Sequence, residues 1–130
     1  MNVRDAIENA ERILPGKAAA DGECDPRWQA IIAIGAFVKT EPEAVWPFIV
    51  RWGSSNDGDL RDAVATCLLE DLLEFHFERF FPRIEDAAHA NAMLADTFSR
   101  CWKFGQAKDA GNAERFEALK AECRKSRLKT

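Results

Sequence analysis

The chain has 130 residues, a length that suits one domain with its own hydrophobic core. Apolar residues make up 47% and charged residues 31%, which excludes a disordered chain, because such chains have too few apolar residues to offset the entropy of ordering. The net charge is -4, since residues 1–65 hold seven Lys/Arg against eleven Asp/Glu and the remainder holds eleven of each. An acidic domain is a poor candidate for DNA binding, whose affinity comes largely from contacts with phosphate.

The first residues, MNVRDAIENAERIL, lack the apolar core of a signal peptide. No apolar run approaches the roughly 20 residues that a membrane span needs. We therefore expect a cytoplasmic protein. Its four cysteines lie far apart and form no C-x-x-C pair, which predicts free thiols rather than a zinc site or a disulfide framework.

Helical signals begin at the amino terminus, where residues 2–14 carry apolar side chains at helical spacing. Asp25 followed by Pro26 predicts the start of a second helix, because an N-cap residue and a proline in the first turn are typical of helix starts. The body of this helix, WQAIIAIGAFV, is apolar almost all round, so we expect neighbours to cover it on several sides. A third helix follows over residues 42–52.

Four more helices are expected in the rest of the chain. The longest begins at Asp59 and reads LRDAVATCLLEDLLEFHF. Another spans residues 78–90 and is bent, or begins, near Pro82, because proline disturbs a helix interior. Asn91 is placed to cap the next helix, which ends at Gly105, and the last one covers residues 112–125. These segments predict an all-α fold of about seven helices with mostly short connections.

A repeat of about 34 residues organises these helices. Residues 25–27 (Asp-Pro-Arg) open one helix, and residues 59–61 (Asp-Leu-Arg) open another. Aromatic–proline steps at residues 46–47 and 81–82 lie inside the preceding helices. Two sets of small or apolar residues also align at this offset and should face one packed layer: Ala30, Val64 and Phe98, and Ala33, Cys67 and Cys101. We expect three stacked helix pairs plus a terminal half-unit, because one unit cannot bury its apolar face alone.

This unit resembles HEAT repeats in the proline of its first helix and in the Asp-x-Arg near the start of its second. The resemblance implies a right-handed stack of antiparallel helix pairs, a HEAT-like α-α superhelix. It predicts a single domain over residues 1–130 with a repeat core at about 25–105. The terminal helices, residues 2–14 and 112–125, would act as caps.

One stretch, FVKTEPEAVWPFIVRWGSSNDGDLRDAVA, resembles more particularly the HEAT-like repeats of the DNA alkylation repair glycosylase family, above all in K-T-x-P-x-x-V-W. The resemblance implies a concave, basic surface with Trp and Asp residues near a damaged nucleotide. This chain departs from that pattern because it is acidic and much shorter than those enzymes. No residue here is matched to a catalytic position of the family.

The long helix expected after Asp59 carries an acidic column. Its members are spaced by four residues, which places them on one side of an α-helix: Asp62, Thr66, Glu70, Glu74 and Glu78. The HEAT resemblance implies that the second helices line a concave inner surface, where the column would meet a ligand. Asp71 lies beside this column. Trp28, near a helix start, and Arg100, on the next second helix, complete the predicted partner-binding site. Trp28 and Trp52, which lie near helix ends, are the tryptophans that we expect to be exposed. The alternative reading is a solvated acidic face, with Arg100 pairing to the column instead.

No catalytic signature is present: the sequence has no nucleotide-binding Gly-rich loop, nucleophile elbow or His-rich metal motif. Glu74, His76 and Glu78 are spaced by two and therefore lie on different sides of a helix, which argues against a metal site. We predict no catalytic residue, no metal and no cofactor.

Three functions fit the sequence. The first is a non-enzymatic binding or scaffold protein, immunity-like or adaptor-like, whose concave and partly acidic surface binds a basic region of a protein partner. The second is a reduced relative of the DNA alkylation repair glycosylases that acts on or binds DNA. The third is a structural subunit that completes a larger helical array.

Overall fold

The computed structural model describes residues 1–19 and 24–128, with side chains up to residue 125. This part of the chain is helical throughout and has no strand, which confirms the all-α fold and about seven helices. Its elements are α1 (Val3–Ile13), α2 (Pro26–Gly35), α3 (Pro42–Gly53), α4 (Gly58–Val64), the π-helical turn η1 (Ala65–Leu69), α5 (Glu70–Ala90), α6 (Ala92–Ser99), the 3-10 turn η2 (Gly105–Lys108) and α7 (Ala110–Leu128). No helix of the described part is long and apolar enough to cross a lipid bilayer.

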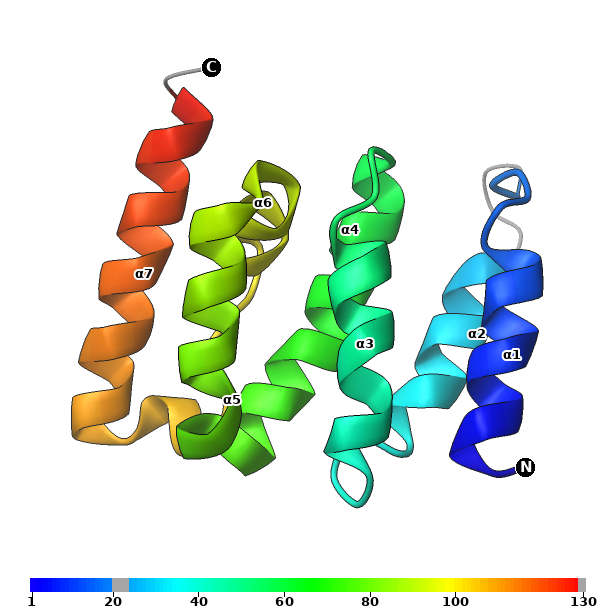
Figure 1. The fold of residues 1–130 in the computed structure, drawn as a ribbon, viewed down its shortest axis with the longest axis horizontal. Coiled ribbons are helices and arrows are strands. Elements are labelled where there is room, and N and C mark those ends of the chain that lie inside the picture. The colour runs from blue at the N-terminus through cyan, green and yellow to red at the C-terminus, as the bar shows by residue number, and fades with distance from the viewer. Residues whose placement is uncertain (20–23, 129–130) are drawn as a thin grey trace.

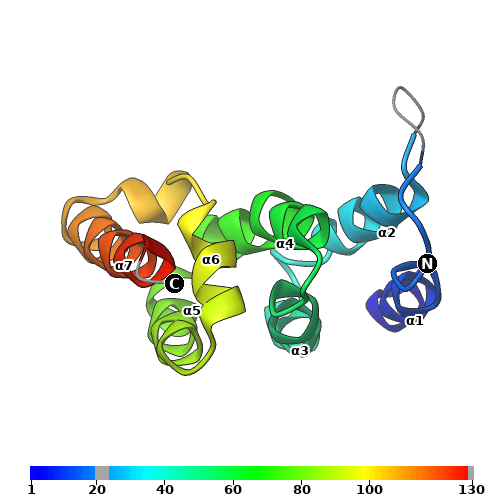
Figure 2. The ribbon, with the colours of Figure 1, turned by 90° about the horizontal axis from the view of Figure 1, so that it is seen from above.

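The helices stand side by side in a row that runs from α1 at one end to α7 at the other (Figure 1). Seen from above, α1, α3 and the part of α5 after His76 form one layer, and α2, α4, the first turns of α5 and α6 form the second (Figure 2). Each first-layer helix pairs with the second-layer helix that follows it, and α7 packs mainly on α6 and closes the row. The chain is therefore a stack of three helix pairs with one terminal helix, while its membership of the HEAT family stays a prediction.

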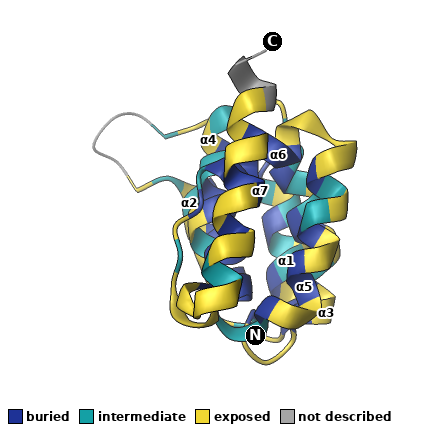
Figure 3. Ribbon diagram, turned by 90° about the vertical axis from the view of Figure 1, so that its left-hand side faces the viewer, coloured by how far each residue is buried: buried dark blue, intermediate teal, exposed yellow. Residues whose placement is uncertain are grey.

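One continuous hydrophobic core runs along the stack, from Val3 in α1 to Cys123 in α7. Viewed end-on, the buried segments lie between the two layers and the exposed segments point outward (Figure 3). Its largest fully buried side chains are aromatic and come from the carboxyl-terminal half: Phe77, Phe80, Phe81, Phe98 and Phe116. Aromatic side chains bury the most area per residue, so this half of the stack holds the densest part of the core.

Helix starts follow their sequence signals closely. The Asn2 side chain accepts a hydrogen bond from the Asp5 N–H, and Asp25 caps α2 through the Arg27 N–H. Asn91 accepts from two backbone N–H groups at the start of α6. The long helix differs, because its N-cap is Asp57 rather than the expected Asp59. Capping by a side-chain oxygen satisfies N–H groups that have no partner within the helix, which explains why Asn and Asp stand at these positions.

The helix expected after Asp59 is not continuous. It contains the π-helical turn η1 and then breaks at His76, where the backbone leaves the helical region with φ -139° and ψ 42°. The sequence predicts a helix boundary at residues 77–78, close to this break, but the bend expected near Pro82 does not occur, because Pro82 lies inside α5 without interrupting it. The amide of Gln106 spans the break, because its Oε1 accepts from the Phe77 N–H and its Nε2 donates to the carbonyl of Phe75.

The segment after α6 also differs from its prediction. The helix ends at Ser99 rather than continuing to residue 105. Residues 101–104 are irregular, η2 follows, and α7 begins at Ala110 instead of at residue 112. Gly105 has φ +52°, a backbone conformation that glycine adopts readily, and it lies against Glu74 of α5. This segment thus packs back onto the second layer.

The 34-residue repeat is only partly reflected in burial. The set Ala30, Val64 and Phe98 is buried throughout, as expected. The set Ala33, Cys67 and Cys101 was expected to behave alike, yet Ala33 is exposed, Cys67 is half-buried and only Cys101 is fully buried. The outer side of the second layer is therefore open at α2 and becomes covered toward the carboxyl terminus.

Candidate protein-binding face

A buried arginine joins the starts of the first two second-layer helices. Arg27 of α2 is only 3% exposed, and its guanidinium group reaches three carboxylates: Asp25 at 3.3 Å, Asp57 at 2.9 Å and Asp59 at 2.8 Å. Burial raises the pKa of Asp25 and of Asp57, but hydrogen bonds from Arg27 outweigh burial and hold both values below the ordinary one. The cluster is an internal link between neighbouring units.

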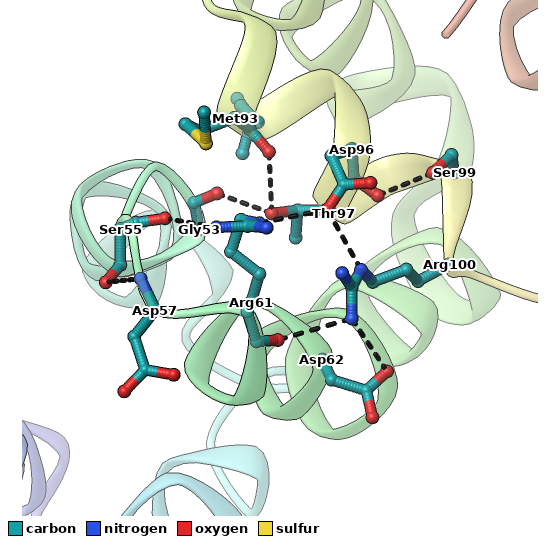
Figure 4. Close-up of polar contacts among 12 residues, drawn as sticks. Gly53, Ser55, Asp57, Arg61, Asp62, Met93, Asp96, Thr97, Ser99 and Arg100 are labelled. Atoms are coloured by element: carbon teal, nitrogen blue, oxygen red, sulfur yellow. Dashed lines mark hydrogen bonds and ion pairs between the residues drawn. The ribbon is translucent and has the colours of Figure 1, made fainter. Parts of the chain in front are cut away.

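The next pair of units has an equivalent link (Figure 4). Arg61 of α4 donates to Asp96 of α6 at 2.9 Å and to the carbonyl of Ser55 at 2.8 Å. Arg100 approaches the same Asp96 at 3.0 Å, and it also lies 3.9 Å from Asp62 of α4. Arg27 and Arg61 are 34 residues apart, so the Asp-x-Arg of the sequence repeat forms contacts between successive units.

These links occupy the guanidinium groups of three arginines of the second layer. Arg27, Arg61 and Arg100 all donate to carboxylates of the same chain. The predicted partner-binding residue Arg100 therefore lies within the network (Figure 4), as the alternative reading had it. Trp28, another predicted residue, is half-buried, and its indole N–H donates to Asp59 at 3.0 Å.

The acidic column takes a different form from the one that spacing by four predicts. Asp62 and Thr66 remain on the outer side of α4 and η1, where Asp62 is half-exposed and Thr66 is exposed. The π-helical turn then adds one residue to the register, because its turns hold more residues than α-helical turns. Asp71 consequently follows Thr66 on the outer side in place of Glu70. We call Asp62, Asp71 and Glu74 the acidic strip.

Glu70 points inward. Its side chain is 7% exposed, and its carboxylate accepts a hydrogen bond from the backbone N–H of Trp102 at 2.8 Å. Burial raises the pKa of this carboxyl above its ordinary value, against the opposing effects of the Trp102 hydrogen bond and the charge of Lys120. Glu70 therefore acts as an internal support for the segment after α6 rather than as part of an exposed surface.

Asp71 and Glu74 lie near each other, three residues apart on one helix. Partial burial and the charge of Glu74 raise the pKa of Asp71. A cationic group from outside would relieve this repulsion, because an opposite charge favours the ionised form of both carboxyls.

Glu78 lies apart from the strip. It follows the break at His76, so it belongs to the part of α5 in the first layer, where it pairs with Arg115 at 3.3 Å. Of the seven predicted partner-binding residues, Thr66 is exposed, and Trp28, Asp62 and Glu74 are half-buried. Burial removes Glu70 from this surface and the helix break removes Glu78, whereas Arg100 lies 3.9 Å from Asp62 and belongs to the arginine network.

The most exposed tryptophan is Trp102, at 67%, whereas Trp28 and Trp52 were expected to be the exposed ones. Phe104 is also exposed. Residues 101–104 alternate, since Cys101 is buried and Lys103 pairs with Glu117, and alternation of this kind is typical of an extended segment. Lys120 lies 4.5 Å from the centre of the Trp102 ring and covers one side of it. Because the sequence predicts a helix over these residues, this alternation was not expected.

The outer side of α2 is open, contrary to the expectation that neighbours would cover it on several sides. Ile32 is 49% exposed, and Ala33 and Ala36 are exposed as well. The residues that pack inward are Arg27, Ala30, Ile31 and Ile34. We call Trp28, Ile32, Ala33 and Ala36 the α2 stripe, and it lies on the side of the second layer that carries the acidic strip.

The hollow between α5, α6 and α7 contains a cysteine whose thiol is not activated. It is lined by Ala88, His89, Ala95, Glu122 and Cys123. Burial raises the pKa of Cys123 to about 11, so its thiol stays protonated at neutral pH and is a poor nucleophile. Across the described residues, no group of three or more His, Cys, Asp or Glu side chains is placed to hold a metal ion.

Comparison of the chain with known protein families, with characterised proteins and with solved structures finds no match.

Proposed function

We propose that the protein is a non-enzymatic binding module, whose acidic strip binds a basic region of a protein partner. The observation that supports this proposal is the arrangement of the strip. Asp62, Asp71 and Glu74 share the outer side of the second layer, and Asp71 has a raised pKa because it is partly buried next to Glu74. Like charges held together in this way favour a cationic partner.

The arginine network favours a protein partner over DNA. A DNA-binding surface needs cationic side chains that are available to phosphate. The guanidinium groups of Arg27, Arg61 and Arg100 instead contact carboxylates of the chain itself. Descent from DNA-binding glycosylases stays a hypothesis of the sequence, and DNA binding is an outcome that the experiment below distinguishes.

A charge reversal in the strip tests the proposal. We expect the double variant Asp71→Lys with Glu74→Lys to keep its helical circular dichroism and to lose its partner. The reason is that each introduced Lys would repel the basic partner that the original carboxylate attracts. Partners are captured from the host lysate with the immobilised protein, identified by mass spectrometry and then measured in purified form. Glu70→Lys is unsuitable, because it would bury a cation and remove the support of Trp102.

The matched control reverses two exposed carboxylates in the first layer, Glu8→Lys and Asp86→Lys, which changes the net charge equally. The control should retain the partner with unchanged affinity. Equal loss in both double variants would show that only net charge matters, and equal retention would show that the strip does not bind. Binding of the wild-type protein to duplex DNA, with affinity that falls steeply with salt, would contradict the proposal in favour of a DNA-binding relative.

A further inference from the structure

We propose that the α2 stripe, together with the acidic strip, is the docking site of one amphipathic helix of the partner, apolar on one side and basic on the other. This inference rests on the proposed function, because the same partner supplies the helix. The stripe supplies the apolar contact, and the strip supplies the charge that selects the occupant.

The repeat places the two features on one face. At the 34-residue offset, Trp28 corresponds to Asp62 and Ile32 corresponds to Thr66. In the structure α2 packs directly on α4 and on η1, and the two helices stand side by side in the second layer (Figure 2). Their approach is close, since a Cβ on Gly35 would lie 3.0 Å from the carbonyl oxygen of Cys67. The apolar stripe and the acidic strip are therefore neighbours on parallel helices.

The α2 stripe has the spacing of a surface that receives a helix. Trp28, Ile32 and Ala36 are four residues apart, so they form one column along α2. The column spans about 12 Å, because a helix rises 1.5 Å per residue. The indole of Trp28 is fixed by its hydrogen bond to Asp59, so the apolar surface is ordered before a partner arrives. Small residues such as Ala33 and Ala36 let a second helix approach closely.

Charge decides which occupant fits. Suppose that an incoming helix packs its apolar side on the α2 stripe. The flank of that helix would then face Asp62, Asp71 and Glu74. Lys or Arg on that flank would pair with the strip, whereas Asp or Glu would be repelled. A second copy of this chain fits poorly, because its net charge is -4 and its own acidic strip would come close to the first.

Binding of a designed peptide tests the inference. The probe is a helical peptide of about 18 residues with Leu on one side and Lys on the other. The first comparison peptide has the same composition in scrambled order and no apolar side, and the second has Glu in place of Lys. We expect the Leu/Lys helix alone to shift NMR signals of the Trp28 indole, of residues 28–36 and of residues 62–74.

Two truncations of exposed apolar side chains give a matched comparison. Ile32→Ala should weaken binding of the Leu/Lys helix by about tenfold, because the truncation removes apolar contact. Met93→Ala, on α6, changes a residue of similar exposure outside the stripe and should leave the affinity unchanged. Neither side chain belongs to the buried core, so the folds of both variants should match the wild type.

Each outcome separates the inference from the proposed function. If Ile32→Ala binds as tightly as Met93→Ala while the strip reversal abolishes binding, the strip binds and the α2 docking site is wrong. If the scrambled peptide binds equally well, the attraction is only electrostatic and the inference is also wrong. Concentration-dependent dimerisation of the wild type that Ile32→Ala abolishes would make a second copy the occupant and overturn the inference. Equal binding of the Leu/Glu helix would contradict both proposals.

Discussion

At the scale of single residues, Arg27 has the clearest structural role. Its nearly buried guanidinium group holds Asp25, Asp57 and Asp59 together across two units. Removing one partner from such a cluster leaves the opposite charges uncompensated, which costs far more than breaking an ion pair in water. Exposed pairs such as Arg51 with Glu11 should contribute little, because water and salt screen them.

We expect Arg27→Ala to lower the free energy of unfolding by about 3 kcal/mol, toward the low end of the range for buried pairs, because Asp57 and Asp59 stay half-hydrated. Arg51→Ala, its exposed control, should lower it by less than about 1 kcal/mol. Urea unfolding followed by circular dichroism measures both values. Similar effects of the two substitutions would contradict the structural role of Arg27.

The same measurement carries a pH dependence. The pKa values of Asp25 and Asp57 are lowered in the folded chain, so the stability that they contribute is present above the ordinary value of 3.8. This contribution is lost as the pH falls through the lowered values. Wild-type stability should therefore drop more steeply below pH 3.8 than the stability of Arg27→Ala.

His89 makes a second prediction at this scale. Its Nε2 lies 2.9 Å from the Glu122 carboxylate, and this hydrogen bond raises the pKa of the imidazole above 6.5. Any contribution of the pair to stability is therefore present below pH 6.5 and disappears as the pH rises through the raised pKa. Proton NMR titration should give a pKa above 6.5 for His89 and a lower one in Glu122→Gln. An unchanged value in the variant would exclude the contact.

At the scale of elements, local signals predicted helix starts better than helix interruptions. Asp25 with Pro26 and Asn91 identified two starts because capping depends on residues next to the cap. The break at His76 has no such local cause. It is stabilised by Gln106 and by the carbonyl of Lys39, both about 30 residues or more away in sequence. Nearby residues placed the boundary between two helices at residues 77–78, close to the break, but they also predicted a bend near Pro82 that does not occur.

The prediction of the binding site was limited in the same way, because it also used only local spacing. Spacing by four placed Asp62, Thr66, Glu70 and Glu74 on one side of a helix, and all of them except Glu70 keep some exposure. It failed for Glu70, because one π-helical turn changes which residue faces outward, and the turn has no signature in its sequence, ATCLL. Asp71 was noted only as a neighbour of the column and takes the outward position. The open side of α2 was missed because an apolar helix does not reveal which of its sides will be covered.

Two glycines provide a prediction at the element scale. Gly105 has φ +52°, and a Cβ there would lie 2.5 Å from Cγ and 2.8 Å from the carbonyl oxygen of Glu74. Gly105→Ala should therefore lower the free energy of unfolding by about 2 kcal/mol or more, through backbone strain and a clash. Hydrogen exchange of the Trp102 amide should also increase, because Glu70 holds this amide from the same helix.

Gly111→Ala is the control for this prediction. A Cβ on Gly111 would meet no atom within 4 Å, and the residue lies in α7. Alanine is a better helix former, so the stability of this variant should stay the same or rise by up to about 1 kcal/mol. If the two variants were equally stable, the packing of Gly105 against Glu74 would be wrong.

At the scale of the whole molecule, the continuous core from Val3 to Cys123 predicts cooperative unfolding. Circular dichroism at 222 nm and tryptophan fluorescence should report the same midpoint in urea. The tryptophans lie in α2, in α3 and after α6, so fluorescence samples most of the stack. An earlier transition in fluorescence than in helicity would show that one end of the stack opens separately, as long repeat arrays do.

The network at the helix starts also constrains how the sequence can evolve. Asp57 caps α4 and, at the same time, pairs with Arg27 of the preceding unit. A substitution at Asp57 would have to replace both functions, so drift at this position should be slow and should be coupled to change at Arg27. A tandem duplication of a whole unit escapes this constraint. Each new copy would bring an arginine that donates to the following unit and an aspartate that accepts from the preceding unit. Lengthening by duplication is thus an easier evolutionary step for this stack than piecemeal change at the contacts between its units.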